Sequence, residues 1–228
     1  MVYCNDLMRC VGRGDEAGAL RLLDSQPELA AARNDSGISV IATSVYLGRL
    51  ELARQIAERR NDLDLFEASC IGATRRVETI LRSEPEAVDY HSPDGFTPLM
   101  LAAHFGHLEL LETLIEKGSD LDTPAANASQ VCAIHSSAAH SDPVRAAALA
   151  RTLLEAGACP NTQQQGGYTA LHEAVLSRNF ELVRTLLAYG ASPHVSNDDG
   201  DSALQLAVAA RETELVELLE SQLPHFPH

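Results

Sequence analysis

Histidine, cysteine and clustered aspartate are the residues of this sequence that could support catalysis or metal binding. The chain of 228 residues has nine histidines and five cysteines. Cys132 and His135 are three residues apart, so one helical turn could bring an imidazole close to a thiol, as nucleophilic catalysis requires. Small apolar residues surround this pair, and most buried cysteines serve only packing. We therefore expect Cys132 to be a structural residue.

Two other patterns fall short of known metal motifs. Asp198, Asp199 and Asp201 surround Gly200 like the first part of a calcium loop, but Ala209 stands where that loop needs a glutamate. The His-Glu pair at positions 172 and 173 lacks the second histidine of a zinc-protease motif. No glycine-rich phosphate loop occurs either. We predict no enzymatic activity, no cofactor and no metal ion.

Charge and composition exclude further classes of protein. The formal net charge is −15, and no basic stretch that could displace counterions from a nucleic acid is present. The excess of acid either serves solubility or favours a basic partner. An odd number of cysteines without a C-x-x-C motif argues against a disulfide framework or a zinc site. Without a signal-like or membrane-spanning apolar run, we expect a cytoplasmic protein that does not bind membranes or nucleic acid.

A repeat appears when the chain is aligned with itself. GYTALHEAVLSRNFELVRTLLAYGASPH, from Gly167, matches GFTPLMLAAHFGHLELLETLIEKGSDLD, from Gly95, without a gap. Each copy has a pair of small residues on a first helix and an apolar pair on a second. The small pairs are Cys10-Val11, Ser44-Val45, Ala68-Ser69, Ala102-Ala103, Ser137-Ala138, Ala174-Val175 and Ala207-Val208. The apolar pairs are Leu22-Leu23, Ile56-Ala57, Ile80-Leu81, Leu114-Ile115, Leu153-Leu154, Leu186-Leu187 and Leu219-Glu220.

These pairs predict an all-α solenoid of seven stacked helix–turn–helix units. We expect one domain over residues 1–223, followed by a flexible tail at 224–228. Units one to seven lie near 3–34, 35–61, 62–92, 93–125, 126–163, 164–196 and 197–223.

Two units depart from the pattern. The small pairs of units two and three are only 24 residues apart, so the segment ERRNDLDLFEA has no room for a projecting loop. In unit five, four extra residues that include Pro143 predict a second helix longer by about one turn.

The sequence from Gly95 to His107, Gly-x-Thr-Pro-Leu-x-x-Ala-Ala-x-x-Gly-His, resembles the ankyrin-repeat signature, and units six and seven resemble it in phase. The proline-containing ends of units one and three, SQPEL and SEPEA, are similar to those of bacterial ankyrin proteins. The resemblance implies a curved stack of helix pairs with hairpin-like loops on one side, and protein recognition through the concave face and loop tips. It also implies that the imidazoles of His107, His135 and His172 hydrogen-bond loop backbones between units.

Aromatic and acidic residues fall at the positions that, by this resemblance, face the groove or the loop tips. We predict partner binding by Tyr46, Asp94, Phe96, His104, Phe105, His140, Tyr168, Asp198, Asp199 and Asp201. Interface anchors are enriched in aromatic residues, and the carboxylates favour a basic partner. Tyr46 is the ring that we most expect to pack between units instead. We expect a monomer that binds an unknown protein, with a permanent inhibitory or scaffolding subunit as the alternative and an enzyme as the less favoured one.

Overall fold

The computed structural model describes residues 2–221, with side chains from Asp6 onward. Within this range the chain forms fourteen α-helices and three short 3-10 helices. The only β geometry among the described residues consists of two isolated bridges, Arg33–Ser39 and Ser196–Ser202. The predicted tail at 224–228 lies outside the described residues.

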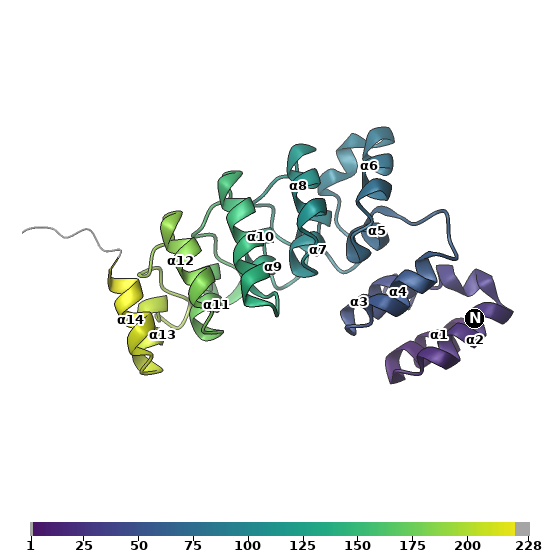
Figure 1. Cartoon of the computed structure of the whole chain (residues 1–228), viewed down its shortest axis with the longest axis horizontal. Coiled ribbons are helices and arrows are strands. Elements are labelled where there is room, and N and C mark those ends of the chain that lie inside the picture. Colours follow the sequence, from purple (N-terminus) through teal and green to yellow (C-terminus); the bar gives the residue numbers. More distant parts are fainter. Residues whose placement is uncertain (1, 222–228) are drawn as a thin grey trace, which may run out of the picture.

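The α-helices form pairs, and the pairs stack side by side in an elongated row (Figure 1). The first helices of the pairs are α1 (Val2–Arg13), α3 (Val40–Tyr46), α5 (Leu65–Ile71), α7 (Pro98–His104), α9 (Ala133–Ala138), α11 (Ala170–Leu176) and α13 (Ala203–Ala209). The second helices are α2 (Glu16–Ser25), α4 (Leu50–Ala57), α6 (Thr74–Ser83), α8 (Leu108–Glu116), α10 (Pro143–Glu155), α12 (Phe180–Ala188) and α14 (Thr213–Glu220). The predicted all-α solenoid of seven helix pairs is confirmed.

Local chemistry sets where the helices begin and end. Thr97 Oγ1 accepts a hydrogen bond from the Met100 backbone N–H at 3.3 Å, and Pro98 occupies the first helical position, where a missing N–H costs nothing. Gly106 separates α7 from α8 with a φ of 78°, a left-handed backbone conformation that favours glycine. The predicted longer helix of unit five is also present, because α10 has 13 residues whereas α8 and α12 have 9 each.

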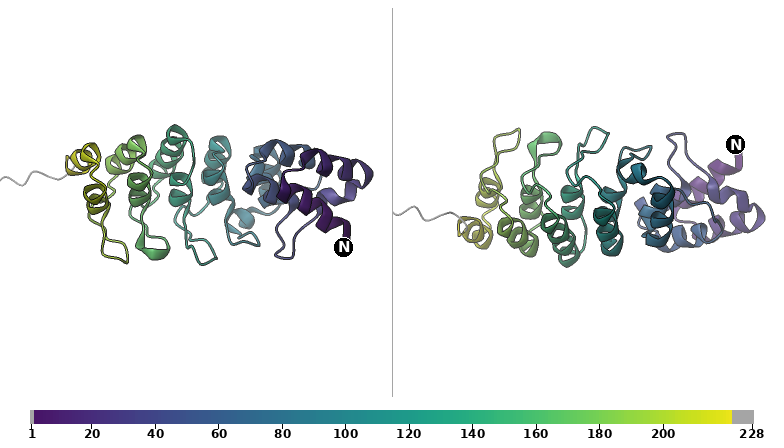
Figure 2. Two further views of the ribbon diagram at one scale, coloured as in Figure 1. Left: turned by 90° about the horizontal axis from the view of Figure 1, so that it is seen from below. Right: turned by 90° about the horizontal axis from the view of Figure 1, so that it is seen from above.

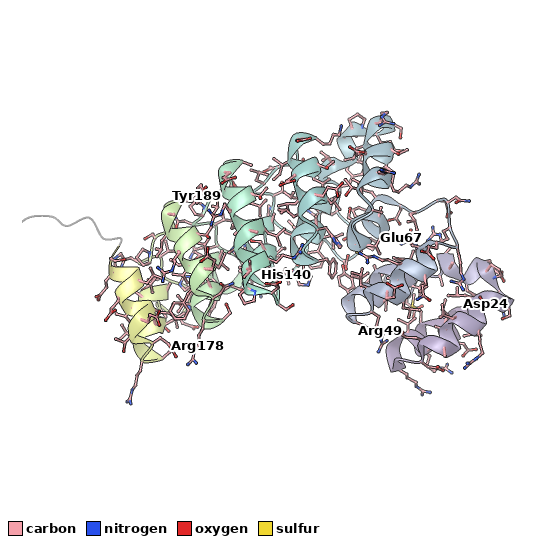
Figure 3. The ribbon with its side chains drawn as sticks, viewed as in Figure 1. Asp24, Arg49, Glu67, His140, Arg178 and Tyr189 are labelled. Atoms are coloured by element: carbon pink, nitrogen blue, oxygen red, sulfur yellow. The ribbon has the colours of Figure 1, made fainter. Side chains whose placement is uncertain are left out.

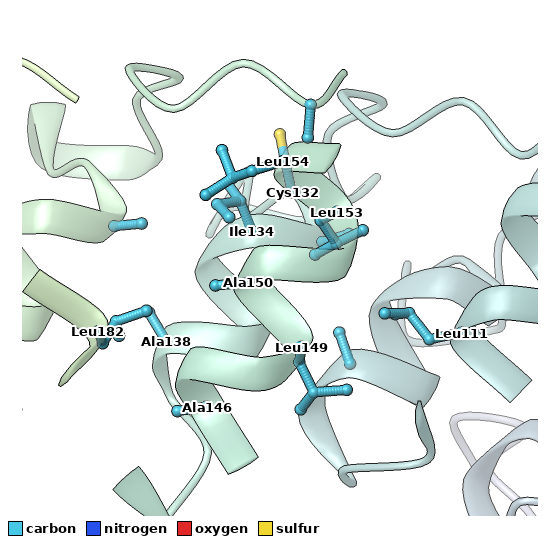
Figure 4. Packing of buried hydrophobic residues seen from close by; sticks show 14 of the residues in the cluster. Leu111, Cys132, Ile134, Ala138, Ala146, Leu149, Ala150, Leu153, Leu154 and Leu182 are labelled. Atoms are coloured by element: carbon cyan, nitrogen blue, oxygen red, sulfur yellow. The ribbon is translucent and has the colours of Figure 1, made fainter. Parts of the chain in front are cut away.

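Neighbouring pairs bury their leucines against each other. Leu114, Leu153 and Leu186 are fully buried, as the repeat pattern predicts. Figure 4 shows the leucines of α10 between Leu111 of α8 and Leu182 of α12. The core is therefore a continuous layer between successive units, the arrangement expected of a solenoid.

The buried side chains divide into two hydrophobic clusters. The larger cluster extends from Leu65 of α5 to Leu219 of α14, and the smaller one holds α1–α4 together with Ile71 of α5 and Leu101 of α7. The border falls in unit three, where the short segment 58–64 joins α4 to α5. Figure 1 shows α1–α4 turned at an angle to the row formed by α5–α14.

The loops that join the other pairs project from one side of the stack (Figure 2). Backbone hydrogen bonds link the tips of four of them in series: Ala126 N–H to Gly95 O at 2.8 Å, Gln165 N–H to Ser129 O at 2.9 Å, and Asp198 N–H to Gly166 O at 2.9 Å. The loops of units four to seven thus form one connected edge beside the first helices.

Candidate partner-binding groove

A groove of about 630 Å³ runs along the face formed by the first helices and the projecting loops. It is lined by Ile38, Tyr46, Asp94, Phe96, Met100, Leu101, His104, Ser129, Val131, His135, Ser136, Ala139, Gln164, Gln165 and Glu173. These residues come from units two, four, five and six. Unit three, which has no projecting loop, contributes none of them, so the groove passes from unit two directly to unit four.

The groove combines an apolar surface with an excess of negative charge. The half-buried Ile38, Phe96 and Val131 supply apolar surface, whereas Asp94 and Glu173 are its two carboxylates. No lysine or arginine is among the lining residues. Burial lowers the pKa of His104 and of His135, so neither imidazole carries a charge that offsets the carboxylates near neutral pH. The lining is therefore negatively charged near neutral pH.

Tyr46 closes the gap that the missing loop of unit three leaves. Its hydroxyl donates to Asp94 Oδ2 at 2.6 Å, and its ring lies 5.6 Å from the Phe105 ring, centroid to centroid. Burial is the main reason that the pKa of Tyr46 is raised far above its usual value, and the carboxylate of Asp94 adds to it. Tyr46 thus packs between units, while its 38% exposed side chain still lines the groove.

Four of the ten residues predicted from the sequence line the groove: Tyr46, Asp94, Phe96 and His104. Phe105 does not belong to the lining. Its half-buried ring packs against the cluster of α1–α4 and lies beside the Tyr46 ring. The two rings can meet because unit three has no projecting loop between units two and four.

His140, Tyr168 and the three aspartates also lie outside the lining. His140 lies at the end of α9 (Figure 3), where its Nδ1 accepts from the Asp142 N–H at 3.1 Å. The Tyr168 ring packs on the His172 imidazole, with centroids 5.6 Å apart. The exposed aspartates follow at the tip of the unit seven loop: Asp198, Asp199 and Asp201.

Several lining residues were missed by the sequence prediction, notably Met100, Ala139 and Glu173. A signal for one of them existed. Glu173 directly precedes the small pair Ala174-Val175, and Leu101 and Ser136, which precede the small pairs of units four and five, line the groove as well. The repeat position before the small pair faces the groove, so a comparison of units at this position could have found the carboxylate.

His135 and His172 hold the loops between units in place, as the resemblance implies, whereas His107 Nε2 bonds the Cys70 carbonyl of helix α5 at 2.9 Å instead of a loop. His135 Nδ1 accepts from the Cys132 backbone N–H at 3.1 Å, and its Nε2 bonds Thr162 O at 3.0 Å. Because both ring nitrogens are engaged, this imidazole cannot take the Cys132 proton. The Cys132 thiol instead donates to Asp122 O at 3.2 Å, and burial raises its pKa to about 11. The pair therefore lacks the geometry of an activated thiol.

Within the described part of the chain, no group of three or more histidine, cysteine, aspartate or glutamate side chains could hold a metal ion. None of its helices has both the length and the apolar character needed to cross a membrane.

Comparison with known proteins agrees with this architecture. Sequence models described as "Ankyrin repeats (3 copies)" match residues 7–125 and 65–164, and one described as "Ankyrin repeats (many copies)" matches residues 153–207. The helical solenoid and these matches together show that this chain belongs to the ankyrin-repeat family.

Individual relatives match this chain over only part of their own length. E3 ubiquitin-protein ligase KEG of Arabidopsis thaliana is 32% identical over 76% of this chain and 10% of its own length. Ankyrin repeat and SAM domain-containing protein 6 of Mus musculus is 40% identical over 34% of this chain and 9% of its own. Putative ankyrin repeat protein FPV014 of Fowlpox virus is 28% identical over 71% and 37%. The chain spans about a tenth of the length of the first two relatives.

Proposed function

We propose that this chain binds another protein through the groove beside its loops and has no catalytic activity of its own. Ankyrin repeats in general are protein–protein interaction modules, which supports the first half of this proposal. The observation that carries it for this chain is the groove itself, whose half-buried apolar residues Ile38, Phe96 and Val131 stay partly open to solvent. Apolar surface gathered in one concave site is typical of a binding surface rather than of an ordinary exposed face.

The charge of the groove supports a basic partner. Asp94 and Glu173 face it without a lysine or arginine in the lining, and the whole chain has a net charge of −15. Electrostatic complementarity of this kind raises association rates and suppresses wrong partners. The same charge argues against nucleic acid as the partner, since the phosphate backbone would be repelled.

Four free cysteines among the described residues support a reducing compartment such as the cytoplasm: Cys10, Cys70, Cys132 and Cys159.

A pair of matched variants tests where the partner binds. Ala139 is an exposed lining residue at the end of α9, so Ala139→Arg fills the groove and opposes a basic partner without touching the core. Val144, at the start of α10 in the same unit, is 73% exposed and outside the lining, so Val144→Arg adds the same charge elsewhere.

The readout is co-purification from the native cell with quantitative mass spectrometry. We expect Ala139→Arg to lose at least one stoichiometric partner that Val144→Arg and the wild type retain. Equal partner sets for all three proteins would show that the groove is not the binding surface. Retention of a single partner at one-to-one stoichiometry through extensive washing would favour the alternative, a permanent inhibitory or scaffolding subunit.

A further inference from the structure

Glu67 and Glu173 occupy the same position in two different repeats. In unit three the Ala73 N–H donates to Ala68 O at 2.8 Å, and in unit six the Asn179 N–H donates to Ala174 O at 2.9 Å. These equivalent hydrogen bonds align Ala68 with Ala174. Glu67 and Glu173, the residues before these alanines, therefore project from equivalent places on α5 and α11.

Glu67 is neutralised within the chain. Its side chain is 1% exposed, and its Oε1 accepts from Arg60 Nη1 at 2.7 Å and lies 3.6 Å from Arg33 Nη2. Its Oε2 accepts from the Asp64 N–H at 3.0 Å, which completes the cap of α5. Figure 3 shows Glu67 where the α3–α4 pair meets α5.

Arg60 reaches this carboxylate because unit three has no projecting loop. It belongs to the segment 58–64, which passes from α4 to α5 where the other connections carry a hairpin. The guanidinium of Arg60 thus binds Glu67, whose repeat position faces the groove in units four to six. In unit three, the carboxylate at this position therefore binds an arginine.

Glu173 has no such cation. Its Oε1 accepts from Gln164 Nε2 at 2.6 Å, and the ion pairs of the described residues do not include it. The side chain is half-buried and lines the groove. Burial raises the pKa of Glu173, and the Gln164 hydrogen bond opposes that rise. A partly desolvated carboxylate that meets only a neutral amide would gain from a charged donor.

We propose that Glu173 is an arginine subsite, and that the partner contributes an extended segment whose guanidinium binds Glu173 as Arg60 binds Glu67. This inference rests on the proposed function and adds the chemistry of the partner. Arginine fits better than lysine because its planar fork can bind the carboxylate with two donors. Apolar residues next to that arginine would lie over Phe96 and Val131, which are half-buried apolar residues of the groove. A volume of about 630 Å³ accommodates a short segment rather than a folded domain.

The test uses twelve-residue peptides selected by phage display on the whole wild-type chain. The most enriched peptide is synthesised with a fluorescein label, and its Kd is measured by fluorescence anisotropy. Glu173→Gln removes the charge, and Glu181→Gln is the matched control, because Glu181 belongs to the same unit but is 55% exposed and pairs with Arg151. Thermal melts establish that each variant is folded.

We expect the enriched peptides to share an arginine beside apolar residues. Glu173→Gln should weaken binding about tenfold or more, as removal of one partner of a desolvated charge pair does. Replacing the peptide arginine with glutamine should cost about as much, and combining both changes should add little further loss. Glu181→Gln should bind like the wild type.

A selection without arginine, or wild-type affinity for Glu173→Gln, would overturn the arginine subsite. The proposed function is tested separately with Ala139→Arg and the same peptide. If Ala139→Arg abolishes binding while Glu173→Gln does not, the groove binds partners without the arginine contact. If Ala139→Arg binds normally, the groove itself is wrongly assigned.

Discussion

The Tyr46 hydroxyl donates a hydrogen bond to Asp94 Oδ2 at 2.6 Å, across the position that a loop of unit three would occupy. The loops of units four to seven are connected by backbone hydrogen bonds between their tips, whereas this side-chain contact joins unit two to unit four. The same two residues line the groove. The place where the repeat is irregular is therefore also one end of the candidate binding surface.

The division of the core predicts unfolding in steps. Among the described residues, helices α1–α4 form a second hydrophobic cluster, to which the rest of the stack contributes only Cys70, Ile71 and Leu101 as buried residues, and the short segment 58–64 joins them to α5. Solenoid units are stabilised mainly by their neighbours, so a weakened junction lets one side unfold first. We expect units one and two to unfold at a lower urea concentration than units four to seven. Urea titration followed by far-UV circular dichroism and by hydrogen exchange of individual segments measures this, and one coincident transition by both probes would contradict it.

Removing the Tyr46 hydroxyl should loosen that junction. Tyr46→Phe keeps the ring against Phe105 but loses the hydrogen bond to Asp94, which should cost about 1–2 kcal/mol of junction stability. Tyr189→Phe is a matched control, because Tyr189 is also 38% exposed and also donates to a carboxylate, that of Glu155 at 3.0 Å. Segment-resolved hydrogen exchange should show faster opening of residues 6–57 in Tyr46→Phe alone. Equal effects of the two variants would mean that the contact has no special role.

A buried leucine in the middle of the stack should be costly to truncate. Leu153 is fully buried, so Leu153→Ala should lose about 2–5 kcal/mol of unfolding free energy. Leu176→Ala removes the same atoms from a side chain that is 60% exposed, and it should change stability by less than about 0.5 kcal/mol. Because units contact only their neighbours, exchange in Leu153→Ala should accelerate most in units four to six. Uniform acceleration along the chain would argue against a stack of this kind.

Acid should destabilise the fold through its buried histidines. Burial lowers the pKa of His107, His135 and His172, so the unfolded chain binds protons first as the pH falls. Their contribution to stability is complete above the unfolded pKa of about 6.5 and is lost as the pH drops below it. We expect the free energy of unfolding to decrease between pH 7 and pH 5.

Unit seven suggests the variant that tests this. There Gln205 Oε1 accepts from the Ser202 N–H at 2.8 Å, as His172 Nδ1 accepts from the Thr169 N–H at 3.0 Å. His172→Gln should keep this cap and lose less stability between pH 7 and pH 5 than the wild type. The exposed His194 gives the control variant His194→Gln, which should follow the wild-type curve. Identical pH dependence of all three proteins would exclude His172 as a cause.

The periodic part of the structure could be predicted from sequence. Pairs such as Ala102-Ala103 and Leu114-Ile115 specify which side of each helix is buried, and Thr97-Pro98 specifies where a helix begins. These signals lie within one unit, so they need no knowledge of the neighbouring unit. The number and order of the helices followed from them.

The irregular junction could not be read in the same way. The spacing between units two and three predicted a missing loop, but not that Tyr46 would reach Asp94 or that Arg60 would bind Glu67. Those contacts join residues that are 48 and 7 positions apart. Each contact lies between two units and is not part of the repeated pattern. They depend on how α1–α4 turn relative to α5, which the pattern within a unit does not determine.

The central claim is that a partner binds in the groove, and methyl NMR of the complex tests it most directly. The half-buried Ile38 and Val131 line the groove, whereas Val144 and Val208 are 73% and 56% exposed and lie outside it. When the co-purified partner is added to methyl-labelled chain, we predict that the Ile38 and Val131 signals shift or broaden while those of Val144 and Val208 keep their positions. Perturbation of Val144 or Val208 with unchanged Ile38 and Val131 signals would contradict the account.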